Sequence, residues 1–278
     1  MIYLNGEILP AEQARIDPFD RGFSLGDGLF ETLRAYDGHP FRLADHLERM
    51  STAAAALEIP LPVDMPGVAE AVTALLSANG HGRGDASIRI TLTRGTGPRG
   101  LAPPPDPRPT LLIATAAYAP LPDTCTAVMV DIRRNEGSPL SRMKALGALD
   151  NVLAAGLATK RGGDEAILAN NAGAIACGAR ANLFALIDGR LVTPPVSDGA
   201  LPGIARRVVL EIAAACRVPI AEISLRAEDL LQADEILLTN SLFEIRSVAR
   251  LDDRALYARA LGDKLRAEYR QMARLFNT

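Results

Sequence analysis

The stretch SPLSRMKALGALDN, residues 138–151, places one lysine, Lys144, directly before an apolar run that predicts a helix. Of the 30 lysines and arginines in the 278-residue chain, only Lys144, Lys160 and Lys264 are lysines. Because arginine fills nearly every other cationic position, a retained lysine suggests chemistry that a guanidinium cannot perform. A lysine amine can lose its proton and attack a carbonyl to form a Schiff base, whereas arginine stays protonated.

The other two lysines have ordinary structural explanations. Lys160 ends the helical run that follows Lys144 and stands just before Gly162 and Gly163, where a cation suits a helix C-terminus and glycine ends the helix. Lys264 lies in an amphipathic C-terminal segment, where we expect a solvated charge. Lys144 precedes its helix, where a positive charge is mildly unfavourable, so neither explanation applies to it.

Composition narrows the class of protein. With 48% hydrophobic residues, the chain can fill the core of one large domain or two moderate ones. The net charge of -3, dispersed arginines and 4% aromatic residues argue against a nucleic-acid partner. No segment has the apolar length of a membrane span and the N-terminus does not resemble a signal peptide, so we expect a cytoplasmic protein with no membrane contact. The three cysteines and three histidines are scattered without metal-ligand spacing, which predicts no metal site and no disulfide framework.

Alternating and helical patterns predict a mixed fold. Asn5-Gly6 and Asp37-Gly38 are strong signals for hairpins, and helical spacing follows at residues 43–57 and 65–78. Prolines interrupt both periodicities at residues 118–125, which we interpret as a linker between an N-terminal lobe, 1–117, and a C-terminal lobe, 126–278. Strands outnumber what alternating strand–helix winding needs, and several are joined by hairpins. The sequence therefore predicts an α+β protein with two lobes.

Two further motifs are weak when each is taken singly. Gly203-Ile204 opens a predicted helix after a proline-containing loop, and free backbone N–H groups at such a helix start can bind phosphate. Arg94 and Arg99 flank glycines in TLTRGTGPRG, where they could clamp a carboxylate. Many helices and glycine-rich loops have these features with nothing bound, so neither motif is specific.

The order of these motifs resembles that of a known family over nearly the whole chain. Five segments resemble motifs of the fold-type IV pyridoxal-phosphate enzymes and follow one another in the same order. They are RGFSLGDGLFETLRAYDG, HLERM, SRMKALGALDNVLA, GIARR and LLQADEILLTNSLFEIRSV. These enzymes form the class IV aminotransferase family, which includes branched-chain aminotransferase, D-amino acid aminotransferase and 4-amino-4-deoxychorismate lyase. The resemblance implies a smaller N-terminal and a larger C-terminal lobe that binds pyridoxal phosphate.

The resemblance also implies roles for individual residues. Lys144 matches the Schiff-base lysine that later acts as acid or base at Cα, and Arg49 matches the arginine that contacts the cofactor phosphate. A threonine of the family is replaced by Ala205, which leaves backbone N–H groups to hold the phosphate there. The other implied cofactor contacts are Cys177, Asn182, Gly203, Ile204, Asn240 and Ser241, and the implied substrate contacts are Phe30, Arg94 and Arg99. Because family members build their sites at a subunit interface, we expect a homodimer.

Cys177 is the main departure from the family pattern. In IACGARANLF it stands where the family has a glutamate whose carboxylate keeps the pyridine nitrogen protonated. A neutral thiol cannot do this, which leaves three interpretations: weak or altered catalysis, a different partner for the ring, or lost activity. Arg180 nearby is one hypothetical cationic partner. From composition, Cys177 reads as a small buried apolar residue.

The substrate is the second open question. D-amino acid aminotransferases have a histidine where this chain has Leu101, whereas RGTGPRG and QADEILLTNSL look closer to aminodeoxychorismate lyases. These enzymes cleave aminodeoxychorismate to 4-aminobenzoate and pyruvate for folate synthesis, and Arg99 would anchor a substrate carboxylate. The leading expectation is therefore a lyase. An aminotransferase acting on D- or branched-chain amino acids and a non-catalytic homologue are the alternatives.

Overall fold

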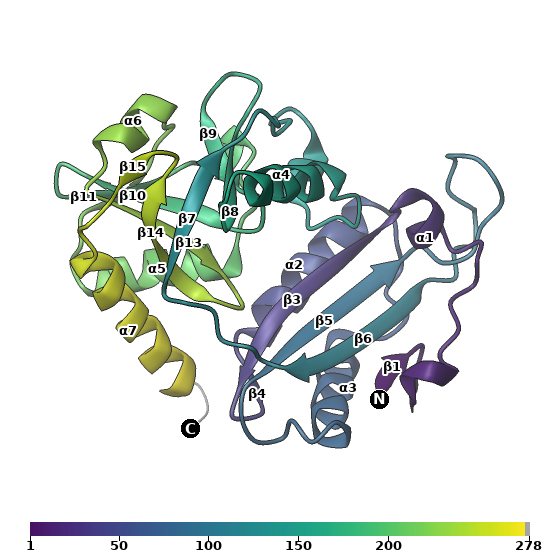
Figure 1. Cartoon of the computed structure of the whole chain (residues 1–278). Coiled ribbons are helices and arrows are strands. Elements are labelled where there is room, and N and C mark those ends of the chain that lie inside the picture. The colour runs from purple at the N-terminus through teal and green to yellow at the C-terminus, as the bar shows by residue number, and fades with distance from the viewer. Residues whose placement is uncertain (276–278) are drawn as a thin grey trace. The chain divides into compact units, whose positions relative to one another are not determined.

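The computed structural model describes residues 1–275, which divide into two units (Figure 1). The first unit contains residues 1–119 and 143–147, and the second contains residues 120–142 and 148–275. No helix within residues 1–275 is long and apolar enough to cross a membrane. No group of histidine, cysteine, aspartate or glutamate side chains in this range could hold a metal ion.

The sheet of the first unit has six strands among residues 1–119, all paired antiparallel in the order β2-β1-β6-β5-β3-β4. Both predicted hairpins are present. Their turns need left-handed backbone, which Asn5, Gly6, Asp37 and Gly38 supply with positive φ angles. The strands are β1 (Ile2–Leu4), β2 (Glu7–Leu9), β3 (Gly28–Tyr36), β4 (His39–Pro40), β5 (Ala86–Thr93) and β6 (Thr110–Ala117).

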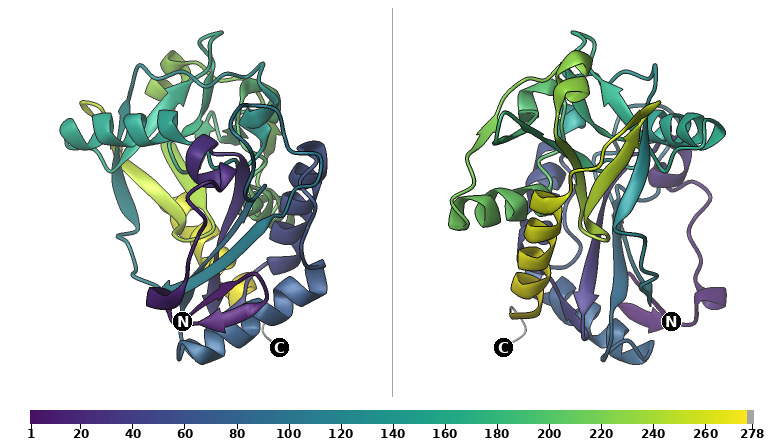
Figure 2. Two further views of the ribbon diagram at one scale, coloured as in Figure 1. Left: turned by 90° about the vertical axis from the view of Figure 1, so that its right-hand side faces the viewer. Right: turned by 60° about the vertical axis from the view of Figure 1, so that its left-hand side comes forward.

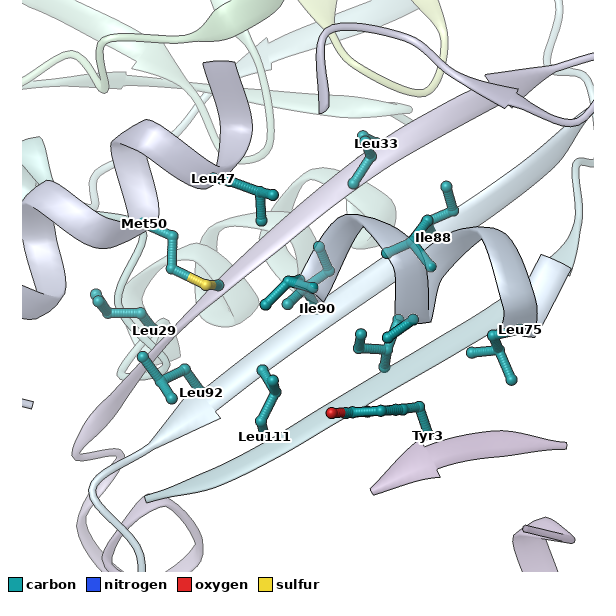
Figure 3. Packing of buried hydrophobic residues seen from close by; sticks show 14 of the residues in the cluster. Tyr3, Leu29, Leu33, Leu47, Met50, Leu75, Ile88, Ile90, Leu92 and Leu111 are labelled. Atoms are coloured by element: carbon teal, nitrogen blue, oxygen red, sulfur yellow. The ribbon is translucent and has the colours of Figure 1, made fainter. Parts of the chain in front are cut away.

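Helices α2 (Leu43–Ala56) and α3 (Met65–Ala78) pack on one face of this sheet and form its core (Figure 3). Leucine and isoleucine side chains from β3, β5 and β6 meet Leu47 and Met50 of α2 and Leu75 of α3. Alternation along β3 sends Leu29, Glu31 and Leu33 to this helix-covered face, and neighbouring Phe30 to the opposite face. Glu31 is the polar residue in that buried row.

The sheet of the second unit has nine strands within residues 120–275. Eight follow the order β12-β11-β10-β13-β14-β7-β8-β9, and β15 pairs with β14. The sheet is mixed, because β7 pairs parallel with both β14 and β8. The strands are β7 (Thr124–Met129), β8 (Glu165–Ala169), β9 (Ile175–Gly178), β10 (Asn182–Ile187), β11 (Arg190–Thr193), β12 (Ile220–Glu222), β13 (Glu235–Asn240), β14 (Glu244–Leu251) and β15 (Arg254–Ala255).

Four α-helices accompany this sheet within residues 148–275: α4 (Leu149–Lys160), α5 (Ile204–Ala215), α6 (Ala227–Gln232) and α7 (Ala260–Leu275). Helix α7 lies along β14 (Figures 1 and 2). Buried Arg266 ties it there by donating to the carbonyl of Ile245, and Glu235 accepts from the backbone N–H groups of Leu261 and Gly262 in its first turn. As predicted, Lys160 ends α4 and Lys264 lies on the C-terminal helix.

The structure differs from the sequence-based expectations in two ways. Short elements went unpredicted, among them α1 (Arg21–Leu25) and α6, because five or six residues hold too few periodic positions. The Lys144 segment, predicted as part of the C-terminal lobe, groups with the first unit. Along the chain, the first unit ends at Ala119 and the second begins at Pro120, and β7 already begins at Thr124, inside the predicted linker.

Candidate active site

The segment around Lys144 continues the sheet of the first unit at β3. The backbone N–H of Phe30 donates to the Lys144 carbonyl and that of Leu146 donates to the Gly28 carbonyl, each at 2.9 Å. A Cβ on Gly28 would lie 2.4 Å from a backbone oxygen of β5 and 2.8 Å from the Leu146 side chain, so glycine permits this close approach. The backbone that directly follows the Lys144 side chain is thereby held against β3.

The Lys144 amine lies 4.4 Å from the centre of the Phe30 ring. Among residues 1–275 it forms no hydrogen bond or ion pair. Burial lowers the pKa of this amine to about 8; the Glu31 charge raises the pKa, and the Arg49 and Arg89 charges lower it. A lysine with this pKa has a substantial free-amine fraction near neutral pH, and the free amine is the form that attacks a carbonyl or removes a proton.

A buried carboxylate joins the predicted phosphate arginine to a histidine. Arg49 Nε donates to Glu31 Oε1 at 2.8 Å and Arg49 Nη2 donates to Glu31 Oε2 at 2.6 Å. His46 Nδ1 lies 2.7 Å from the same Oε2. Although burial raises the pKa of Glu31, its hydrogen bonds to His46 and Arg49 outweigh burial and lower the pKa to about 2. Burial is the main cause that lowers the pKa of His46, so a neutral imidazole donates to an ionised carboxylate.

Arg89 is a site residue that the sequence analysis missed. It lies on β5, and its guanidinium stacks 3.6 Å from the centre of the Phe30 ring, which the Lys144 amine also contacts. The guanidinium forms no hydrogen bond or ion pair among residues 1–275. From strand alternation, Arg89 reads as an ordinary solvent-facing arginine. Its place beside Lys144 makes it a candidate to bind an anionic group.

Arg94 and Arg99, predicted as a pair of substrate contacts, have different surroundings. Arg94 is buried, and its Nε donates to Asp27 Oδ2 at 2.8 Å. Its Nη1 and Nη2 donate to the carbonyls of Glu58 and Leu57. These bonds use each nitrogen of the guanidinium and tie the end of β5 to the loop after α2. Arg94 therefore has a structural role here.

Changing Arg94 to alanine is expected to lower the free energy of unfolding by about 1 to 3 kcal/mol, because it removes the hydrogen bonds of a buried guanidinium to Asp27 and to the Leu57 and Glu58 carbonyls. Arg99→Ala is the matched control, since an exposed arginine contributes within about 0.5 kcal/mol. Urea unfolding followed by circular dichroism measures both. Equal stability of the two variants would contradict the structural role of Arg94.

Arg21 holds the loop that carries Arg99 through hydrogen bonds to the loop backbone. This buried guanidinium donates to the carbonyls of Gly100, Leu101 and Ala102 at 2.9 to 3.3 Å. Arg99 itself is exposed. Its substrate contact stays a prediction.

The second unit carries the other predicted cofactor residues, and α5 begins among them. Gly203 is the N-cap residue, and no side chain caps the helix, so backbone N–H groups of its first turn, which includes Ile204 and Ala205, lack a side-chain partner. Asn182 Nδ2 donates to the carbonyl of Leu201 at 2.9 Å. A Cβ on Gly203 would lie 2.0 Å from Asn182 Oδ1, so the two residues are in tight contact. A helix start of this kind suits a phosphate.

Asn240 and Ser241 lie in the turn between β13 and β14, at the same end of the sheet. Asn240 Oδ1 accepts from the N–H groups of Leu242 and Phe243 at 3.0 Å, and its Nδ2 donates to the carbonyl of Arg180 at 3.1 Å. The Asn240 side chain therefore shapes the turn that presents Ser241.

Cys177 lies on β9 with its thiol buried. Burial raises the pKa of this thiol to about 11; the Arg134 charge lowers the pKa and the Glu165 charge raises it. The thiol is therefore neutral at physiological pH. Cys177 has the burial expected of a small apolar core residue, and it offers no negative charge.

Arg180, the hypothetical cationic partner of the ring, binds a carboxylate and a carbonyl of the second unit. Its Nε donates to Glu165 Oε2 at 3.0 Å, and its Nη2 donates to the carbonyl of Asp164 at 2.9 Å. Glu165 is buried, and its carboxylate neutralises the Arg180 guanidinium. The sequence does not show which carboxylate pairs with which arginine, so this ion pair was not predicted.

Comparison with known proteins decides the family. The sequence model of the amino-transferase class IV family matches residues 28–251. The chain belongs to the class IV aminotransferase family. The α+β class is confirmed, and the fold is that of the fold-type IV enzymes.

Several class IV aminotransferase family members resemble the chain over nearly its whole length. The "Putative branched-chain-amino-acid aminotransferase" of Methanocaldococcus jannaschii is 35% identical over 98% of this chain and 96% of its own. The aminodeoxychorismate lyase of Bacillus subtilis is 33% identical over 91% of this chain and 87% of its own. The crystal structure of a branched-chain aminotransferase from Thermoproteus uzoniensis with norvaline has a TM-score of 0.93 and 30% identity, covering 98% of this chain and 94% of that one.

As a class IV family member, the chain is an enzyme that depends on pyridoxal phosphate. The first unit fits this cofactor, because Lys144 offers an unpaired amine of lowered pKa for its carbonyl. Arg49 and the uncapped start of α5 are each suited to a phosphate. Cys177 fits less well, because its thiol is neutral and the resemblance implies a carboxylate at this position. When bound, the cofactor supplies an electron sink for charge that builds at Cα.

The lowered pKa of Lys144 predicts how the rate at which the cofactor-free protein captures pyridoxal phosphate depends on pH. The free amine is the reactive form, so the capture rate should rise about tenfold per pH unit and level off above about pH 8. An ordinary lysine would level off only near its reference pKa of about 10.4. Absorbance after mixing with pyridoxal phosphate between pH 6 and 11 measures the rate. A midpoint near the ordinary value would contradict the desolvation of Lys144.

Proposed function

We propose that the chain is an aminodeoxychorismate lyase that forms 4-aminobenzoate and pyruvate for folate synthesis. The observation that carries this proposal is the neutral, buried thiol of Cys177 at the position where the family has a glutamate. Without a carboxylate beside the pyridine nitrogen, the cofactor is a weaker electron sink. Such a site suits a reaction in which the negative charge at the amine-bearing carbon is transferred quickly to a leaving group.

An elimination meets this requirement better than an amine transfer. Lys144 removes the proton from the amine-bearing ring carbon, and the electron pair forms a ring double bond as the neighbouring C–O bond breaks. The enolpyruvate that leaves takes up a proton and becomes pyruvate, while the ring becomes aromatic. As the ring becomes aromatic, the negative charge from the amine-bearing carbon passes to the products. In amine transfer the same charge must persist until the proton is delivered to another carbon.

Arg89 and Arg99 are the proposed anchors for the substrate, which carries two carboxylates. Arg89 is the better placed on present geometry, because its guanidinium and the Lys144 amine contact the same Phe30 ring. Arg94 is not proposed for this role, since its guanidinium nitrogens already bind Asp27 and two carbonyls.

The test incubates the enzyme loaded with pyridoxal phosphate with aminodeoxychorismate and no 2-oxo acid. We expect 4-aminobenzoate, measured by fluorescence, and pyruvate, measured with lactate dehydrogenase, in equal amounts. Product that forms only when 2-oxoglutarate is added, with glutamate appearing, would overturn the lyase proposal.

An aminotransferase acting on D- or branched-chain amino acids is the second candidate. It is favoured by the branched-chain aminotransferases among the similar proteins, one of them a structure with norvaline. The 2-oxoglutarate requirement separates it from the lyase. A third candidate, a non-catalytic homologue, is indicated if cofactor attaches to Lys144 but neither reaction occurs.

A homodimer is part of the same proposal. Helix α4 leaves four apolar side chains exposed, Leu149, Val152, Leu153 and Leu157, and their spacing places them on one helical face. A second copy of the chain could cover this face. Light scattering of the purified protein should give twice the monomer mass, and Leu153→Glu should reduce it to that of the monomer. A cytoplasmic location stays a prediction.

A further inference from the structure

Glu31 is a buried carboxylate that the proposed reaction does not use. It projects from β3 toward α2, where its two oxygens accept from two nitrogens of Arg49, and Oε2 also lies within hydrogen-bonding distance of His46 Nδ1. Glu31 and His46 are each 1% exposed, so the contact is shielded from water. A fully buried carboxylate is unfavourable unless such partners compensate it. Its position beside Arg49 suggests a purpose beyond folding.

We propose that Glu31 is a positioning residue that fixes the direction of the Arg49 guanidinium, with His46 holding Glu31 in turn, so that Arg49 is preset to bind the cofactor phosphate. This inference rests on the proposed phosphate contact of Arg49. It does not depend on whether the enzyme is a lyase or an aminotransferase.

The geometry supports positioning through the two-point contact. Two parallel hydrogen bonds from one guanidinium to one carboxylate fix the plane of both groups, whereas a single contact leaves the guanidinium free to rotate. An arginine side chain otherwise loses much rotational entropy when it binds a ligand. Because Glu31 already orders Arg49 in the folded protein, this entropy is lost during folding and not during cofactor binding. Glutamine at this position could accept at only one oxygen, and its amide N–H₂ would face a donor.

The charged groups around Glu31 decide the pH at which its effect on Arg49 can be measured separately from its effect on Lys144. Lys144 and Arg89 are the other charged groups whose fields reach it, from the segment after Arg142 and from β5. Glu31 is the carboxylate among these cations and raises the pKa of Lys144. Its removal should therefore lower that pKa further, below about 8, and also release Arg49. Measuring at pH 9.5, where Lys144 is largely free in either case, isolates the Arg49 effect.

The experiment compares binding of pyridoxal phosphate and of pyridoxal, which lacks the phosphate, to protein freed of cofactor. Spectral titration at pH 9.5 gives both dissociation constants without any substrate. For Glu31→Gln we expect pyridoxal phosphate to bind roughly 10- to 100-fold more weakly, and pyridoxal to change less than about threefold. Equal losses for both ligands, or no loss for either, would overturn the proposal.

Two further variants keep the test decisive. Glu235→Gln removes a buried carboxylate that caps α7 in the second unit, and should leave the ratio of the two constants unchanged. His46→Gln keeps the Glu31–Arg49 contact but loosens it, and should weaken pyridoxal phosphate selectively by roughly threefold to tenfold. If Glu31→Gln does not fold, His46→Gln decides, and an unchanged ratio there refutes the proposal. Lyase activity plays no part in these readings, so failure of the proposed reaction is distinguishable.

Discussion

Replacing Lys144 by arginine is expected to abolish covalent capture of pyridoxal phosphate and to lower turnover by roughly 1,000-fold or more. The variant keeps the positive charge and most of the side-chain length. It removes the amine that can lose its proton, whose pKa burial lowers to about 8. Because backbone bonds between Lys144 and Phe30 and between Leu146 and Gly28 hold this segment, the fold should persist. Absorbance titration with cofactor and the pyruvate assay measure the two losses.

Lys160→Arg and Lys264→Arg are the matched controls for this change. Both lysines lie on helices of the second unit, at the end of α4 and on α7, and both changes should leave capture and turnover within about twofold. Circular dichroism checks that all three variants fold. Turnover of Lys144→Arg close to that of the unchanged enzyme would contradict the assigned role.

Changing Cys177 to glutamate is expected to raise turnover by roughly 10- to 100-fold, because it restores a carboxylate where the family has one. A negative charge beside the pyridine nitrogen would keep that nitrogen protonated and strengthen the electron sink. Amine transfer should gain more than elimination, since it depends longer on the stored charge. Rates with aminodeoxychorismate alone and with an amino acid plus 2-oxoglutarate give the two gains.

The same change should destabilise the protein without cofactor. Cys177 is buried, and a carboxylate there lacks a partner until the cofactor binds, which costs about 1 to 3 kcal/mol. Cofactor should restore most of that stability. Cys177→Ala is the control, because it exchanges one small neutral group for another and should change the rates less than about threefold. Rates of Cys177→Glu no higher than those of Cys177→Ala would show that the ring has a different partner.

Local sequence signals predicted most of the fold. Hairpins were readable at Asn5-Gly6 and Asp37-Gly38 because few residues adopt positive φ without strain. Helices α2, α3 and α5 were readable from apolar spacing, and Lys144 from its chemistry. In contrast, the grouping of residues 143–147 with the first unit depends on backbone pairing with β3, which leaves no mark in the sequence of the segment.

Side-chain pairing across long separations limited the prediction of the site. Glu31 and Arg49 are 18 residues apart, and Arg94 binds carbonyls more than 35 residues away. A sequence motif shows that an arginine is present but not which acceptors occupy it. Arg94 was predicted as a substrate contact, and its guanidinium binds Asp27 and two carbonyls instead. Arg89, for which no role was predicted from the sequence, stacks on the Phe30 ring. The pairing of Arg180 with Glu165, 15 residues away, was not predicted for the same reason.

The central claim is that Lys144 holds the cofactor, and borohydride reduction tests it most directly. The purified enzyme is mixed with pyridoxal phosphate, reduced, digested and analysed by peptide mass spectrometry. We predict one phosphopyridoxyl group, on the peptide that contains Lys144. A label on Lys160 or Lys264, or no label on Lys144, would contradict the account.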